Sequence, residues 1–207
     1  MPNDSNERQA RAAQLRDRLL EITRARGYIY REQPFKLSSG GYSHDYVDMR
    51  RAVARGEDLQ VVAESVLADL AADGIDFDAI GGLTMGADPV AHAVALVGSR
   101  SWYSVRKAEK DHGRGNRIEG ALLGKDTRAI VFEDTTSTGR SVIEALEAVQ
   151  ATGATVVCAL TLLDRGELAK QAFAERGVDY RALLSYRDLG IIAVEESPTT
   201  AGAQASS

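Results

Sequence analysis

Hydrophobic and polar positions follow two spacings along this chain, and the two spacings predict different secondary structure. Apolar residues three and four positions apart predict amphipathic helices over residues 8–26, 58–72, 89–97, 141–151 and 167–176. Short apolar runs predict buried strands over residues 77–80, 102–105, 129–132, 155–163 and 181–184, with residues 189–194 adding a little more. Strands that alternate with helices imply βαβ units, so the pattern predicts an α/β fold with a central parallel sheet flanked by helices.

A smaller element is predicted before this alternation begins. Residues 28–30 form a short apolar run, and the alternation around Tyr46, Val47 and Met49 predicts a second strand. The turn sequence at residues 38–41 between them favours a hairpin. We expect residues 1–7 to be frayed, residues 1–195 to form a single domain and residues 196–207 to form a disordered tail, because both ends are polar.

Composition narrows the class of protein. The 207 residues are enough for a hydrophobic core, and a net charge of -5 gives no reason to expect nucleic-acid or membrane-surface binding. Cys158 is the single cysteine, which excludes an intramolecular disulfide, and nothing in the sequence indicates a cysteine-based metal site. No secretory signal or membrane-spanning run is present in the sequence, so we expect a cytoplasmic protein without membrane partners.

Residues 129–141 hold the strongest chemical signal. The acids Glu133 and Asp134 follow the predicted strand, and a small polar loop then leads into a helix: Thr135, Thr136, Ser137, Thr138 and Gly139. The N–H groups of such a loop and helix N-terminus bind phosphate, while the carboxylates can hold sugar hydroxyls or a hydrated magnesium ion. The segment therefore indicates a phosphorylated sugar as ligand. The alternative is a solvated strand end followed by an ordinary helix cap.

Two further segments could bind anions. Residues 81–89 form a glycine-rich turn before a helix, with Thr84, Gly86 and Ala87 placed to approach a phosphate; a plain tight turn is the alternative. Residues 106–120 form a long polar loop whose cations could cover a diphosphate: Arg106, Lys107, Lys110 and His112. A solvated surface loop is the alternative there.

Arg165 follows the strand predicted over residues 155–163. An arginine at this rim of a parallel sheet is placed for bidentate binding of a carboxylate. An ion pair with Asp164 or Glu167 is the structural alternative.

The acid pair and the loop after it resemble the 5-phosphoribosyl 1-diphosphate (PRPP) signature of type I phosphoribosyltransferases. Four motifs in order resemble, more narrowly, the orotate phosphoribosyltransferases. They comprise Phe35, Leu37, Ser39, Gly40, Ser43 and Tyr46; Gly81, Gly82, Gly86, Ala87 and Pro89; Arg106, Lys107, Lys110, His112, Gly113 and Ile118 to Gly120; and Glu133, Asp134, Thr138, Gly139 and Ser141. The third motif separates the orotate enzymes from purine and uracil relatives, and the match covers residues 35–165.

The resemblance implies the type I phosphoribosyltransferase fold, with a small N-terminal hood over residues 28–50 completed by C-terminal elements. It implies conversion of orotate and PRPP to orotidine 5′-monophosphate and diphosphate, with Mg²⁺ as cofactor, in a homodimer that shares lid residues between subunits. The implied catalytic residues are Arg106, Lys110, His112 and Asp134. The implied PRPP ligands are Thr84, Gly86, Ala87, Arg106, Lys107, Lys110, His112, Glu133, Asp134, Thr135, Thr136, Ser137, Thr138 and Gly139. The implied orotate ligands are Ser39, Gly40, Tyr46, Thr138 and Arg165, and Glu133 and Asp134 would hold the metal through water.

The chain departs from the family pattern at the first motif. Ser38 stands where many members have a lysine, and Gly41 stands where an arginine is common; Lys36 could replace the lysine if the segment is extended there. Two alternatives remain open at this point: a phosphoribosyltransferase for another nucleobase, or a non-catalytic PRPP-sensing regulator. Against the regulator, the N-terminus offers no helix-turn-helix pair and no basic patch.

Overall fold

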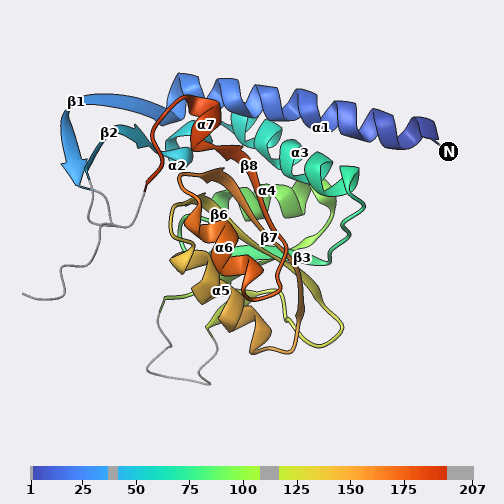
Figure 1. Ribbon diagram of the computed structural model, residues 1–207. Helices are drawn as coiled ribbons and strands as arrows, with labels where there is room; N and C mark the ends of the chain where they lie inside the picture. The colour runs from blue at the N-terminus through green and yellow to red at the C-terminus, as the bar shows by residue number, and fades with distance from the viewer. Residues whose placement is uncertain (1, 37–41, 108–116, 195–207) are drawn as a thin grey trace, which may run out of the picture.

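Six strands form the central sheet of the computed structural model, which describes residues 2–36, 42–107 and 117–194 (Figure 1). Their order across the sheet is β5-β4-β3-β6-β7-β8. The strands are β3 (Ala79–Leu83), β4 (Ser101–Val105), β5 (Ile118–Gly120), β6 (Arg128–Thr136), β7 (Thr155–Asp164) and β8 (Tyr180–Ser185). All neighbours are parallel except β4 and β5, so the predicted α/β fold with a parallel sheet is confirmed.

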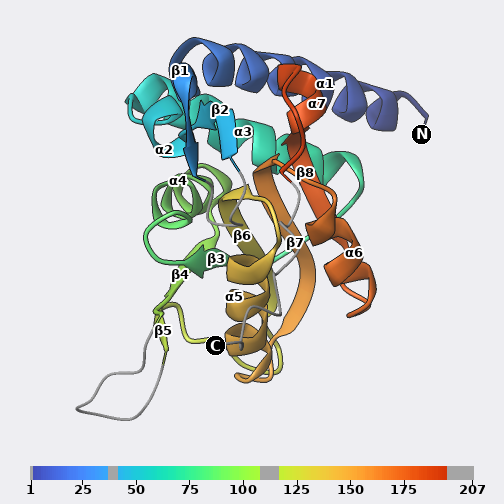
Figure 2. The same ribbon diagram turned by 60° about the vertical axis from the view of Figure 1, so that its left-hand side comes forward.

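Alternate residues of β6 face two separate hydrophobic cores. Ile130 and Phe132 pack in the core that contains α1 (Pro2–Ile22), α3 (Gly56–Ala72) and α4 (Asp88–Gly98). Ala129 and Val131 pack in the core that contains α5 (Arg140–Gln150) and α6 (Leu168–Ala174). Figure 2 shows α5 across the sheet from α1 and α3. Because all four side chains are fully buried, β6 is the central strand to which both helical layers attach.

The N-terminal hairpin lies beside the sheet as a separate two-stranded element (Figure 1). Strands β1 (Tyr28–Lys36) and β2 (Tyr42–Val47) are antiparallel, which confirms the predicted hairpin and extends its first strand. Val47 and Met49 are buried in the core, so they fix the hairpin to the domain. Asp48 then starts the short helix α2 (Met49–Ala52) by accepting from the Arg51 N–H at 3.1 Å. The turn predicted at residues 38–41 lies outside the described residues.

Helix α1 begins at Pro2, so the frayed end predicted for residues 2–7 is wrong. Asp4 lies in the first turn, where its charge suits the helix dipole, and it pairs with Arg8 one turn later at 2.7 Å. After Ile22 a π-helical turn, η1 (Thr23–Gly27), connects α1 to the hairpin. Over the described part of the chain, none of the helices has the length and apolar character needed to cross a membrane.

Two other predictions near the sheet were wrong. Residues 118–120 form β5 rather than loop, since a three-residue strand with a single buried residue, Ile118, leaves no detectable period. Residues 189–194 add no strand. Asp188 accepts from the N–H and hydroxyl of Ser185 in a capping box, which forms the short helix α7 (Tyr186–Leu189), and Gly190 ends it with φ 70°.

Two glycines predicted to form an anion-binding turn lie inside β3 instead. A Cβ on Gly81 would lie 1.9 Å from the Tyr103 carbonyl oxygen of β4. A Cβ on Gly82 would lie 1.8 Å from the Phe132 carbonyl oxygen of β6. These glycines therefore allow β3 to approach its two neighbours, and the turn itself, for which anion binding is predicted, is limited to residues 84–87.

We expect Gly82→Ala to lower the free energy of unfolding by about 3 kcal/mol, because the new methyl group would overlap a backbone oxygen that cannot move alone. Gly124→Ala is the matched control, since a Cβ at Gly124 meets nothing within 4 Å. Urea unfolding of both variants measures the difference. Equal stabilities would show that β3 tolerates a side chain at Gly82.

Candidate active site

Four parallel strands end at one edge of the sheet, and the predicted site residues follow them there. The loop of residues 84–87 follows β3, Arg106 and Lys107 follow β4, residues 137–139 follow β6, and Arg165 follows β7. The chain leaves β3 toward β4 on one side and leaves β6 toward β7 on the other. The boundary between β3 and β6 is therefore a topological switch point, where α/β sheets bind ligands.

The acid pair lies within β6 rather than after it, which corrects the predicted strand end. Glu133 is paired with Thr161 of β7, and the ladder continues to Thr136 opposite Asp164. The Thr161 hydroxyl also donates to the Glu133 carbonyl at 3.1 Å. Because β7 is long, the ladder extends past the apolar run and holds both acids on rigid backbone.

Burial is the main electrostatic influence on this pair. Glu133 is only 7% exposed, and burial together with the charge of Asp134 raises the pKa of its carboxyl, while Lys107 opposes the shift. Burial also raises the pKa of Asp134, against the Thr135 N–H, which donates to it at 2.8 Å. Two buried carboxyls side by side favour a shared proton or a bound cation.

The turn after β3 packs directly against the acids. A Cβ on Gly86 would lie 2.7 Å from Glu133 Oε1 and 2.9 Å from Asp134 Oδ1, so a larger residue would displace the carboxylates. The Thr84 N–H donates to the Val105 carbonyl at 2.9 Å, and the buried Ala87 leads into α4. The structure thus brings this turn and the acid pair together from opposite sides of the switch point.

A polar pocket of about 230 Å³ opens between the hairpin end and the acids. Its predicted members are Tyr46, Gly86, Asp134 and Thr135. Sequence reasoning missed Asp48 and Arg50, whose charges act on Asp134 in opposite directions. The sequence signal for these two residues was their position just after Val47, the apolar end of β2. The other lining residues are Val47 and Met49.

The loop between β6 and α5 has the form of an anion-binding helix N-terminus. The Gly139 N–H donates to the Thr136 hydroxyl at 3.2 Å, and the Arg140 N–H donates to that of Thr138 at 3.4 Å. Gly139 has φ 79°, a conformation that favours glycine and turns the chain into α5. The positive end of α5 therefore lies directly beyond residues 135–139.

Arg165 is buried between the end of β7 and the hairpin. Its exposed fraction is 5%, and its Nε and Nη2 atoms have no hydrogen-bond partner within the described ranges. Burial lowers the pKa of its guanidinium, and the nearby charge of Asp45 opposes this shift. Asp45 also accepts from the Tyr28 hydroxyl at 2.8 Å. Sequence reasoning missed Tyr28 and Asp45, because only folding brings the hairpin beside β7.

The structural alternative for Arg165 is not found. Asp164 accepts from the Tyr180 hydroxyl at 2.8 Å and from the Gly166 N–H at 3.0 Å. Glu167 pairs instead with Arg187 at 2.7 Å. The Arg165 N–H donates to the Thr136 carbonyl at 2.8 Å, which places this arginine beside the phosphate-type loop. A buried guanidinium with unsatisfied donors is suited to a carboxylate ligand.

The polar loop after β4 is described only at its base. Arg106 pairs with Glu119 of β5, with 3.3 Å between Nη1 and Oε1. Lys107 is close enough to Glu133 to lower the pKa of that carboxyl. Lys110 and His112 lie outside the described residues, as do Ser39 and Gly40. Their predicted roles stay predictions.

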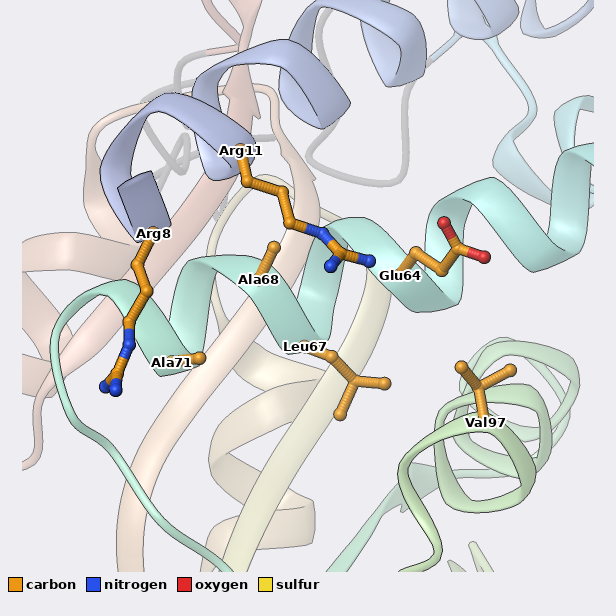
Figure 3. Close-up of a pocket in the computed structure, with 7 residues that line it drawn as sticks. All are labelled: Arg8, Arg11, Glu64, Leu67, Ala68, Ala71 and Val97. Carbon is orange, nitrogen blue, oxygen red and sulfur yellow. The ribbon is translucent and has the colours of Figure 1, made fainter. Parts of the chain in front are cut away.

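A second hollow, of about 310 Å³, lies between α1, α3 and α4 (Figure 3). Arg8 and Arg11 extend from α1 beside an apolar floor that includes Leu67 and Ala71 of α3. Val97, near the end of α4, also lines it, and α4 leads into the amino end of β4. This hollow is therefore at the opposite edge of the sheet from the acid pair, and no predicted site residue lines it.

We expect Glu133→Gln to stabilise the ligand-free protein at pH 8. Because the pKa of Glu133 is raised on folding, the folded state binds more protons above pH ~4.3, and stability falls as the pH rises through this range. The neutral amide removes that penalty, so we expect a gain of about 1 kcal/mol at pH 8 and none at about pH 4. Urea unfolding at both pH values measures it, with Glu147→Gln on the exposed face of α5 as control. A loss of stability at pH 8 would contradict the assigned electrostatics.

No protein-family model matches the chain. The orotate phosphoribosyltransferase of Streptomyces avermitilis is 47% identical over 161 residues, which cover 75% of this chain and 87% of that protein. That of Corynebacterium glutamicum is 39% identical over 182 residues, covering 86% and 96%. The crystal structure of Mycobacterium tuberculosis orotate phosphoribosyltransferase in complex with PRPP superposes with a TM-score of 0.70 at 35% identity, covering 86% and 99%. Adenine phosphoribosyltransferase from Leishmania donovani, at 16% identity and a TM-score of 0.63, shares the fold alone. The chain therefore belongs to the orotate phosphoribosyltransferase family and has the type I phosphoribosyltransferase fold.

Proposed function

We propose that this chain transfers the phosphoribosyl group of PRPP to orotate, forming orotidine 5′-monophosphate and diphosphate in pyrimidine nucleotide synthesis. The observation that supports it most directly is Arg165, a buried guanidinium with unsatisfied donors next to a phosphate-type loop. Orotate differs from the other common nucleobases in its carboxylate, so a buried arginine beside a phosphoribosyl site favours orotate.

Each part of PRPP has a matching part of the site. The 5′-phosphate would bind the loop of residues 135–139 at the N-terminus of α5. The ribose hydroxyls would bind Glu133 and Asp134, and the diphosphate would lie over residues 84–87. Arg106 and Lys107, with Lys110 and His112 of the same loop, would neutralise the diphosphate.

The acid pair also suits magnesium, which the family generally uses with PRPP. Within the described ranges, no group of three or more His, Cys, Asp or Glu side chains could hold a metal ion. Two carboxylates with raised pKa values can still bind hydrated Mg²⁺ together with substrate oxygens. Bound in this way, the ion would supply positive charge against the leaving diphosphate.

The proposed reaction breaks the bond between the anomeric carbon and the diphosphate and forms one to the orotate ring nitrogen, whose proton passes to the departing diphosphate. Arg165 would hold the orotate carboxylate, with Tyr46 of the hairpin and Thr138 beside the base. Ser39 and Gly40, which lie outside the described residues, are the other predicted orotate ligands. Lys107 and Arg106 would stabilise the charge that develops on the diphosphate. No protein nucleophile is needed, because orientation and charge neutralisation lower the barrier.

The base side differs from many relatives at Ser38 and Gly41, where basic residues are common. Lys36 is the last residue of β1 and is exposed, so it is the candidate replacement in the described part of the hairpin.

The resemblance further supports a cytoplasmic homodimer with lid residues shared between subunits. Sedimentation velocity would detect a species with twice the mass of one chain.

The test of the proposal is the change in ultraviolet absorbance when purified protein, PRPP, magnesium and orotate are mixed. Orotate consumption that requires both PRPP and magnesium is the expected result. Hypoxanthine and uracil are parallel substrates, and faster turnover of either would reassign the base. PRPP binding without turnover of any base would indicate a regulator.

We expect Arg165→Gln to lower kcat/KM for orotate about 100-fold, because charge-assisted hydrogen bonds to the carboxylate are lost. PRPP affinity should stay within about twofold of wild type. Arg187→Gln is the control, since Arg187 is exposed and pairs with Glu167 on the surface. Steady-state kinetics with each substrate varied separates the two effects, and an equal loss for both substrates would argue against a carboxylate-binding role.

A further inference from the structure

Arg117 connects three parts of the proposed site with one side chain. Its Nε donates to the Arg106 carbonyl at 2.9 Å, and its Nη2 donates to the Lys107 carbonyl at 3.4 Å. The same Nη2 pairs with Oε1 of Glu144 on α5. In return, the Arg106 N–H donates to the Arg117 carbonyl at 2.8 Å. The end of β4, the start of β5 and α5 are therefore joined at one guanidinium.

These contacts lie where the β-ladder no longer supports the chain. The pairing of β4 with β5 stops at Val105 opposite Ile118, so Arg106 and Lys107 lie beyond it. The backbone contacts of these two residues that the structure describes all go to Arg117. Since Lys107 acts electrostatically on Glu133, a shift of this backbone would move a cation relative to the acid pair.

The other end of the connection is equally specific. Glu144 lies in the second turn of α5, and α5 begins directly after the loop proposed for the 5′-phosphate. Both side chains are partly buried, with exposed fractions of 26% for Arg117 and 38% for Glu144. A planar guanidinium can reach two carbonyls and a carboxylate at once, whereas an ammonium group cannot match this fork.

We propose that Arg117 is a positioning residue, anchored by Glu144, that holds Arg106 and Lys107 in place against the diphosphate of PRPP. The inference rests on the proposed function, and it assigns to Arg117 no contact with substrate. Loss of Arg117 should therefore disturb the backbone of Arg106 and Lys107 and leave the stability of the whole protein nearly unchanged, because a partly exposed ion pair contributes little to global folding.

The test compares PRPP binding by calorimetry and steady-state kinetics in Arg117→Ala, Arg117→Lys and Glu144→Gln, with Glu147→Gln as the matched control one turn along α5. We expect Arg117→Ala to weaken PRPP binding and lower kcat/KM for PRPP about 10-fold, because small misplacements of charged groups have large effects. The KM for orotate at saturating PRPP should change less than about twofold, and the melting temperature by less than about 2 °C.

The remaining variants test whether the planar guanidinium of Arg117 or only its positive charge is needed. Arg117→Lys should recover little of the loss, since lysine keeps the charge without the fork. Glu144→Gln should cause a smaller loss, about threefold, and no further loss in the Arg117→Ala background, because Glu144 acts through Arg117. Glu147→Gln should match wild type.

Four results would count against the inference, the proposed function or both. Equal PRPP affinity in wild type and Arg117→Ala would overturn the inference, and so would parallel losses for orotate, PRPP and melting temperature. Wild-type protein that binds PRPP but converts no base would overturn the proposed function alone, because the binding comparison still tests Arg117. Wild-type protein that does not bind PRPP would overturn both.

Discussion

The burial of two adjacent carboxylates at the centre of the sheet is the constraint on which the site depends. Glu133 and Asp134 are held on β6, where low solvent access disfavours two negative charges. The surrounding structure supplies partial compensation through the Thr135 N–H and the charges of Lys107 and Arg50. A cation and a polyol with hydroxyl donors, as in the proposed function, would complete this compensation.

Close packing around this pair explains why small residues surround it. Gly86 leaves room for the carboxylates, while Gly82 lets β3 approach β6. Gly86 of the turn after β3 and Asp134 and Thr135 of β6 then line the same pocket, one from each half of the sheet. The backbone bond from Arg165 to Thr136 extends this arrangement to the base side. The positions proposed above for phosphate, sugar and carboxylate would thus be related through backbone hydrogen bonds of the sheet and its loops.

The hairpin, which is a separate two-stranded sheet, and the chain at the ends of β4 and β5 bring further groups to the site. The hairpin brings Tyr46, Asp48 and Arg50 to the pocket and Asp45 to Arg165. The chain directly after β4 brings Lys107 toward Glu133, and the Arg117 side chain donates a hydrogen bond to the Lys107 carbonyl. β5 pairs with β4 over only three residues, and the hairpin is fixed to the domain through buried residues such as Met49.

The sequence by itself determined the fold class, and it predicted most of the residues that line the candidate site. Periodicity predicts the helices and parallel strands, because a helix buried on one face has spaced apolar residues and a strand buried on both faces has a continuous apolar run. The acid pair with its Thr/Ser/Gly loop was recognisable because phosphate binding at a helix N-terminus needs consecutive residues. The length of a β-ladder depends on the partner strand. Local sequence therefore wrongly predicts that Glu133 follows its strand and that residues 118–120 are loop.

Only the tertiary structure decided which distant groups meet. Gly81 and Gly82 proved to serve strand packing, since the atoms that exclude a Cβ belong to Tyr103 and Phe132. Arg165 could have paired with Asp164, and the structure gives that acid to Tyr180 instead. Asp45 and Glu144 had no local signature, since their partners lie on other elements. Contacts between residues far apart in the chain follow from how the layers pack, and spacing along one segment does not record them.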